Sequence, residues 1–409
     1  MNHEYRRALF SILILLSLMA PALPTDACSS FLMRSENGLF VGRNDDILVE
    51  TPVPGILVVN QRGVAKVAFP IDANQTRPFT WTSRFGSVTF SYAGKNFPDG
   101  GMNEAGLVIE EMSLDDTQPP KLDGAILLMQ PQWIQYQLDT HRTVDEVIAS
   151  LSRFTPVVGG WHYLVADATG QVAVIEFING ETVVHTAQDL APAVLANDTY
   201  SSCRDGLKQF NGFGGDRPIP DGLKPSEGTH LNQYQGFGGS RPIPEGVYSA
   251  NRFARAASLL AGYDRHPVGP EIDFAFDVLQ SLSFGIGTKR SIVHDLTGRK
   301  IYFRTETHQE VRHILLDDLD FSATQPSLCV DLNRRISGDV APHLMAWRPE
   351  HDQPIVEYIF GLVERNPDSE VVTMSHATHG LLDSSETLLE FNQRLLTHLG
   401  TPEAQDAEN

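Results

Sequence analysis

The first half of the chain is dominated by short runs of apolar and β-branched residues separated by Gly, Asp and Asn. Runs of this length with turn residues between them are typical of β-strands. The predicted strands lie at 29–35, 39–44, 55–60, 87–93, 106–112, 162–166 and 172–177, and two more lie at 291–295 and 300–304.

Helical patterns occur between and after these strands. Thr143 and Glu146 form a capping-box pattern that opens a helix with Val144 and Val147 on its apolar side. Later helices are predicted at 249–263, 355–364 and 384–399. Runs of antiparallel strands interrupted by helical blocks favour a layered α+β fold over a regular βαβ alternation.

The first 27 residues have the pattern of a removable leader. Arg6 and Arg7 precede an apolar run at 9–20 that is too short to span a bilayer comfortably, and small residues follow it. Cleavage after Ala22 and cleavage after Ala27 both fit this pattern. No later stretch approaches the length of a transmembrane segment. We therefore expect a periplasmic or secreted protein without stable membrane anchoring.

The mature chain is expected to form one domain. We assign residues 28–400 to this domain, exclude the leader at 1–27, and expect the polar segment 401–409 to be a disordered tail. A Gly/Pro-rich sequence at 213–222 recurs with small changes at 237–246. Two copies are too few for a solenoid, which needs at least ~3 repeats. The duplication therefore predicts a long excursion of two similar loops at about 210–246.

Net charge and cysteine content narrow the possible functions. A formal charge of −20 disfavours binding to nucleic acid or to an anionic membrane surface. Three cysteines in an exported chain leave one odd thiol, which needs an explanation in an oxidising compartment. Cys203 and Cys329 are predicted to form a disulfide or to remain two inert buried thiols. Cys28, at the predicted processing site, is then the free one.

A cysteine at the N-terminus of a chain carries two useful groups. Its thiol is a nucleophile, and its α-amine, with a reference pKa near ~8, can act as the base. Such a site needs an acceptor for the amine, a cation that favours the thiolate, and donors for the developing oxyanion.

The predicted hairpin brings candidates for the first two of these roles to Cys28. The dipeptide Asn37-Gly38 suits the positive φ angles of a tight turn. Pairing the strands through this turn places Asp46 within reach of the amine of Cys28, and Arg43 opposite Leu32 on the face of Cys28. A slip of one residue would exchange these faces.

The segments around these residues resemble the choloylglycine hydrolases, the penicillin V acylases and bile salt hydrolases among the N-terminal nucleophile hydrolases. Cys28-Ser29-Ser30 followed by Gly42-Arg43-Asn44-Asp45-Asp46 is similar to the opening of those chains. The resemblance covers nearly the whole mature chain, in order and at matching spacing, through the segments at 101–107, 143–147, 162–167, 194–198 and 248–255.

The resemblance implies a role for each of several residues. Cys28 matches the nucleophile, Arg43 the arginine beside the thiol, and Asp46 the aspartate that binds the α-amine. Asn197 matches the asparagine whose side-chain amide helps to form the oxyanion hole. Arg252 matches the second active-site arginine, which supports the charge network.

The resemblance also implies a four-layer αββα sandwich of two antiparallel sheets, no metal or organic cofactor, and hydrolysis of the amide bond of small N-acyl amines. Penicillin V and acyl-homoserine lactones are expected as substrates ahead of bile salts, because the leader indicates export. Related members use an extension in the region of the repeat for tetramer assembly, so a homotetramer is the first expectation. Ser113 stands where members have Asn or Tyr, which leaves the preferred acyl group and amine open.

A protein of another class shares part of this pattern. A cysteine also follows the leader of lipoproteins, where Leu precedes it by three positions and a small residue comes next, whereas this chain has Thr25 and Asp26 there. A catalytically silent exported binding protein or lipoprotein on the same scaffold is therefore the alternative. The mass of the mature N-terminus separates the two, since a diacylglyceryl group on Cys28 excludes the enzyme.

Overall fold

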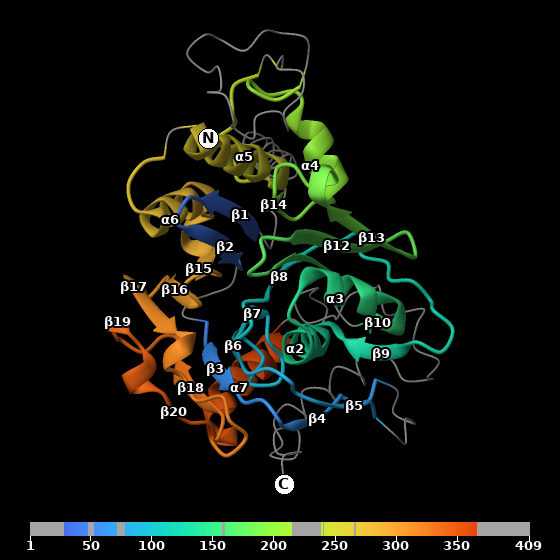
Figure 1. Cartoon of the computed structure of the whole chain (residues 1–409), viewed down its shortest axis with the longest axis vertical. Coiled ribbons are helices and arrows are strands. Elements are labelled where there is room, and N and C mark those ends of the chain that lie inside the picture. The colour runs from blue at the N-terminus through green and yellow to red at the C-terminus, as the bar shows by residue number, and fades with distance from the viewer. Residues whose placement is uncertain are drawn as a thin grey trace, which may run out of the picture.

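The computed structural model describes residues 28–47, 53–71, 78–157, 160–214, 239, 241–265 and 267–365 (Figure 1). The predicted leader, the helix at 384–399, the tail at 401–409 and most of the repeat lie outside the described residues. Within the described ranges, no helix has both the length and the apolar character needed to cross a bilayer.

One layer is a seven-stranded sheet with the spatial order β14-β1-β2-β15-β16-β17-β19, antiparallel except between β17 and β19. Its strands are β1 (Ser29–Ser35), β2 (Gly38–Asp46), β14 (Val194–Leu195), β15 (Thr288–Asp295), β16 (Lys300–Thr305), β17 (His308–Leu315) and β19 (Gly338–Asp339). Two helices cover its outer face, α5 (Ser249–Arg265) and α6 (Glu271–Leu282) (Figure 1).

The second layer is a nine-stranded antiparallel sheet with the order β13-β12-β11-β8-β7-β6-β3-β18-β20. Its strands are β3 (Ile56–Asn60), β6 (Ser87–Ser91), β7 (Gly100–Asn103), β8 (Val108–Ser113), β11 (Trp161–Ala166), β12 (Val172–Ile178), β13 (Glu181–Thr186), β18 (Leu328–Asp331) and β20 (Met345–Ala346). The helices on its outer face are α2 (Gln130–Thr140), α3 (Val144–Ser150) and α7 (Pro349–Arg365).

The remaining elements are short. β4 (Ala65–Val67) pairs with β5 (Thr80–Thr82), β9 (Ile126–Met129) pairs with β10 (Phe154–Val157), and α4 (Tyr200–Leu207) follows β14. The main apolar core lies between the two sheets and continues under α5 and α6. The order helix, sheet, sheet, helix confirms the predicted αββα sandwich.

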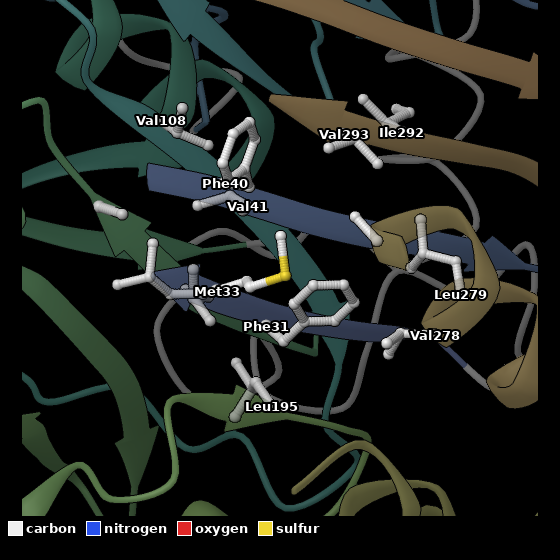
Figure 2. Packing of buried hydrophobic residues seen from close by; sticks show 14 of the residues in the cluster. Phe31, Met33, Phe40, Val41, Val108, Leu195, Val278, Leu279, Ile292 and Val293 are labelled. Atoms are coloured by element: carbon white, nitrogen blue, oxygen red, sulfur yellow. The ribbon is translucent and has the colours of Figure 1, made fainter. Parts of the chain in front are cut away.

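Strand β1 lies at the centre of this packing, because β14 and β2 flank it and both of its faces are covered. Residues 29–33 are accordingly all buried. Figure 2 shows Phe31 of β1 beside Leu279 of α6. A Cβ atom at Gly42 of β2 would lie 2.3 Å from the ring of Phe31, so only glycine leaves room for this ring. This contact helps to set how β1 lies on β2, and therefore where Cys28, just before β1, is held.

The hairpin of β1 and β2 forms as predicted, but its turn and register differ from the prediction. Arg43 pairs with Ser30 rather than with Leu32. The reason lies in the turn, where the hydroxyl of Ser35 accepts hydrogen bonds from the N–H groups two and three residues further on, at 3.1 and 3.2 Å. Because the register moves by two residues, every side chain keeps its face. Arg43 therefore stays on the face of Cys28.

Most predicted elements appear with shifted ends. The capping box forms as predicted, since the hydroxyl of Thr143 accepts a hydrogen bond from the N–H of Glu146 at 3.2 Å. The helix predicted from Ile355 instead begins at Pro349 and contains Pro354. Proline at the first helical position has a suitable φ angle and loses no helical hydrogen bond, which favours this earlier start. Helices α2, α4 and α6 were not predicted.

Candidate active site

The thiol of Cys28 lies at the start of β1 and is buried, with 6% of the residue exposed. Its Sγ donates a hydrogen bond to Oδ1 of Asp45 across 3.6 Å and lies 3.9 Å from the carbonyl oxygen of Asp46. Continuing the β1–β2 register by one pair places Asp45 directly opposite Cys28. The end of β2 therefore forms one wall around the sulfur.

Arg43 lies behind Asp45 on the same face of β2. Its Nη1 donates to Oε2 of Glu110 at 2.8 Å and to the carbonyl of Asp99 at 2.9 Å, and its Nη2 lies 3.4 Å from Oδ1 of Asp45. Burial alone lowers the pKa of a guanidinium, but Asp45, Glu110 and Cys28 raise the pKa of Arg43 well above its usual range. Arg43 therefore stays positive, and Asp45 accepts hydrogen bonds from both Arg43 and the thiol.

A second buried arginine, Arg290 of β15, completes this ionic cluster. Its Nη2 lies 2.8 Å from Oδ2 of Asp45 and also bonds to Asp99. Its guanidinium stacks on the ring of Tyr92 at 4.0 Å. Burial opposes the ionisation of Asp45, but Arg290 and then Arg43 outweigh it and lower the pKa of Asp45. Asp45 is thus held as a carboxylate against the thiol.

The side chain of Asp46 points to the other face of β2, toward α5 and α6, and is buried. Its Oδ1 accepts a hydrogen bond from the hydroxyl of Thr288, while Oδ2 has no hydrogen-bond partner among the described residues. Burial raises the pKa of Asp46 to about 7, although the Thr288 hydrogen bond and the charge of Arg252 act in the opposite direction. A buried carboxylate with one free oxygen is suited to accept a hydrogen bond from a cationic group.

Arg252 of α5 connects Cys28 to Asn197. Its Nη1 donates to the carbonyl oxygen of Cys28 and to the hydroxyl of Ser29, and its Nη2 donates to Oδ1 of Asn197 at 2.7 Å. Burial lowers the pKa of Arg252, and the nearby carboxylate of Asp46 opposes this shift. One guanidinium thus holds both the backbone of Cys28 and the side chain of Asn197.

Asn197 lies just after β14, on the other side of β1. Continuing the β1–β14 register by two pairs brings it level with Cys28. Its Nδ2 donates to the hydroxyl of Ser113 at 2.7 Å and to the carbonyl of Ser113 at 3.0 Å. Because Ser113 ends β8, the amide of Asn197 bridges the two sheets beside the thiol.

The structure brings together all the residues that the sequence nominated for the site, namely Cys28, Arg43, Asp46, Asn197 and Arg252. Sequence reasoning missed Asp45, Arg290 and Glu110 as parts of it. Asp45 had a usable signal, since the predicted register, like the observed one, puts it on the face of Cys28. Arg290 and Glu110 come from strands far along the chain, and no local spacing connects them to the hairpin.

The two other cysteines are separate buried thiols rather than a disulfide. Cys203 lies in α4 and Cys329 in β18, and burial raises the pKa of each thiol to about 12. Of the two sequence alternatives, the structure therefore has inert thiols. Across the described ranges, no group of three or more His, Cys, Asp or Glu side chains is placed to hold a metal ion.

Solved structures of two hydrolases share this architecture. Penicillin V acylase from Agrobacterium tumefaciens aligns with a TM-score of 0.64 and 24% identity, over 79% of this chain and 98% of that one. Conjugated bile acid hydrolase from Clostridium perfringens aligns with a TM-score of 0.58 and 17% identity, over 76% of this chain and 98% of that one. These likenesses show that the chain has the fold of these two hydrolases.

Sequence comparison identifies the family. The profile of linear amide C–N hydrolases of the choloylglycine hydrolase family matches residues 28–331. Penicillin V acylase from Pectobacterium atrosepticum is 32% identical over 127 residues, which cover 27% of this chain and 34% of that protein. The match thus spans about a third of the length of this curated relative. The chain belongs to the choloylglycine hydrolase family of linear amide C–N hydrolases.

Proposed function

We propose that this chain is an exported amide hydrolase whose nucleophile is Cys28, exposed as the N-terminal residue once residues 1–27 are removed. The observation that carries the proposal is the convergence of polar groups on this cysteine. Asp45 contacts its sulfur, Arg252 contacts its carbonyl oxygen, and the free oxygen of Asp46 lies on the neighbouring strand.

The first half of the reaction forms a thioester. The sulfur of Cys28 attacks the carbonyl carbon of the amide as the α-amine takes the thiol proton. The tetrahedral intermediate collapses when the C–N bond breaks and the α-ammonium passes its proton to the departing amine. The buried carboxylate of Asp46 holds the α-amine in place, because a paired ammonium group satisfies its free oxygen.

The oxyanion of this intermediate needs donors beside the sulfur. Asn197 supplies a side-chain N–H at the level of Cys28, and Arg252 orients that amide by donating to its oxygen. The amide donates to Ser113 in the free chain, and an oxyanion beside the sulfur would take over one of these two hydrogen bonds. In the second half of the reaction, water attacks the thioester with the α-amine again as base, and the acid leaves.

Phenoxyacetyl penicillins and acyl-homoserine lactones are the substrates that we propose first, ahead of bile salts. Two relatives described as penicillin V acylases support this order, together with the leader that indicates export. A panel of phenoxyacetyl, fatty-acyl and bile-acid amides, incubated with the mature chain and with Cys28→Ala, tests the proposal. Release of free amine by the mature chain alone is the expected result. Equal release by Cys28→Ala would refute the mechanism.

We also propose a homotetramer assembled through the duplicated loop at about 210–246, most of which lies outside the described residues. The flanks of this loop support an excursion from the domain, since the N–H of Asn211 donates to the carbonyl of Arg241 at 2.8 Å. Deleting one repeat copy and measuring the mass in solution tests the role. A monomer both before and after the deletion would contradict it.

A further inference from the structure

Asp45 lies between the thiol of Cys28 and the two buried arginines of the site. Its Oδ1 accepts the hydrogen bond from Sγ at 3.6 Å and lies 3.4 Å from Nη2 of Arg43, while its Oδ2 lies 2.8 Å from Nη2 of Arg290. The charged group in hydrogen-bond contact with the sulfur is therefore a carboxylate. The sequence predicted a cation beside the thiol, and both Arg43 and Arg290 bind the carboxylate that contacts the sulfur.

Charged residues from several elements lie around Cys28, either in contact with it or in the ion-pair network of Asp45. They are Arg43, Asp45 and Asp46 of β2, Arg252 of α5, Arg290 of β15, Glu110 of β8 and Asp99 beside β7. Each arginine of the ionic cluster is paired twice, Arg43 with Asp45 and Glu110, and Arg290 with Asp45 and Asp99. The positive charge of each is thus shared between two carboxylates, which weakens the attraction of Arg43 for a thiolate.

We propose that Asp45 is a further catalytic residue, which keeps Cys28 a neutral thiol in the free enzyme until the α-amine takes its proton. A carboxylate within hydrogen-bond distance stabilises the S–H form, because a thiolate at the same place would face a like charge in a buried environment. During attack, the bond from sulfur to the substrate carbonyl forms while the S–H proton moves to the α-amine. Asp45 loses the hydrogen bond from the thiol in this step, takes no proton and keeps its contacts with Arg43 and Arg290. This inference rests on the proposed function in naming Cys28 as the nucleophile.

The test is the rate at which iodoacetamide alkylates Cys28 as a function of pH, measured on the mature chain without substrate. Mass spectrometry of the peptide that contains Cys28 distinguishes its alkylation from that of Cys203 and Cys329. In Asp45→Asn, the rate at pH 7 is expected to rise by about tenfold or more, with the midpoint of the curve at lower pH, because a like charge beside the thiol has been removed.

Two further variants make this result specific. Asp99→Asn removes a carboxylate from the same arginine, Arg290, but it is Asp45 that contacts the sulfur, so the alkylation rate of Asp99→Asn should rise clearly less than that of Asp45→Asn. Asp45→Glu keeps the charge and should shift the curve less than Asp45→Asn. An unchanged or slower rate in folded Asp45→Asn, or an equal acceleration in Asp99→Asn, would overturn the proposal.

Removing one partner of a buried ion pair can prevent folding, so the wild-type chain provides a second measurement. Its alkylation midpoint is expected at or above the ~8.5 of a free cysteine. A midpoint more than about one pH unit below that reference would overturn the role of Asp45. Since no substrate is present, this failure is distinguishable from a failure of the proposed function, which the hydrolysis panel with Cys28→Ala detects.

Discussion

Arg252 donates a hydrogen bond from Nη2 to Oδ1 of Asn197 across 2.7 Å. This contact decides which way the amide of Asn197 points, since its oxygen accepts from Arg252 and its nitrogen donates to Ser113. The same guanidinium holds the carbonyl oxygen of Cys28. The nucleophile and the proposed oxyanion donor are therefore positioned by one side chain.

The role of Asn197 can be tested by a change that keeps its contact with Arg252. Asn197→Asp retains an acceptor for the guanidinium but has no N–H to donate, so kcat is expected to fall by roughly 10²–10³-fold with the fold intact. Steady-state kinetics on the best amide substrate measures this. Ser113→Ala serves as the control, since it removes only an acceptor of the Asn197 amide, and its kcat should remain within about threefold of the wild type. Near-normal kcat in Asn197→Asp would exclude it as the donor.

Processing at Cys28 should switch activity on. An amide nitrogen has no basic lone pair, and a residue ahead of Cys28 would occupy space that the substrate needs. A chain that begins Met-Cys28 is expected to be active after methionine removal, whereas a chain with a non-cleavable residue before Cys28 should be folded and inactive. Mass spectrometry of the N-terminus accompanies each assay. Full activity in a chain that retains Ala27 would exclude the N-terminal nucleophile assignment.

Asp46 should make the unprocessed chain less stable at neutral pH than at acidic pH. With a pKa of about 7 in the folded chain against 3.8 as reference, the folded state holds a proton that the unfolded state loses, so stability falls as pH rises from about 4 to about 7. Asp46→Asn in a chain that keeps Ala27 should therefore raise the free energy of unfolding, by about 2 kcal/mol more at pH 8 than at pH 5. Urea denaturation at both pH values measures this.

The mature chain provides the opposite outcome for the same substitution. Once Ala27 is removed, the α-ammonium is available to pair with Asp46, so Asp46→Asn should give no such gain in stability and should abolish most activity. If the stability gain at pH 8 is equal in the two forms, Asp46 does not hold the α-amine.

Glu176, which lies near Asn197, is expected to make the stability of the fold decrease at acidic pH. Its Oε1 accepts hydrogen bonds from the N–H of Tyr200 at 2.8 Å and from Nδ1 of His162 at 3.0 Å, and His185 lies 3.3 Å from its Oε2. Burial by itself raises the pKa of Glu176, but the hydrogen bonds from His162 and His185 lower it to about 2. Tyr200 begins α4, directly after the segment that carries Asn197.

A carboxylate with a lowered pKa stabilises the fold fully above its unfolded pKa and loses that contribution as pH falls through the folded value. The wild-type chain should therefore lose on the order of 3 kcal/mol between about pH 4.5 and pH 2 through Glu176. Glu176→Gln should be less stable at pH 7 and show a flatter dependence over this window. Denaturation curves at several acidic pH values check this, and parallel losses in both chains would contradict it.

Local features of the chain were readable from the sequence alone. The apolar run before the turn dipeptide placed β1, and the capping box at Thr143 placed the start of α3, because both depend on neighbours within a few residues. The order of motifs along the chain likewise nominated Cys28, Arg43 and Asn197. The predicted hairpin also kept its faces, since the register moved by two residues and side chains alternate with that period.

Contacts between distant segments were decided only by the tertiary structure. Helix α2 carries several buried glutamines and lacks a clear apolar stripe. Its polar side chains form hydrogen bonds with other parts of the fold. Gln132 accepts one from the N–H of Phe69 at 2.8 Å, and Gln130 accepts one from the hydroxyl of Tyr163 at 2.6 Å. The charge of Asp45 also depends on a contact between distant segments. In the sequence Asp45 is only one polar residue at the end of a predicted strand, and its ion pair with Arg290 of β15 forms only in the folded chain. The charge state of a buried group depends on such partners.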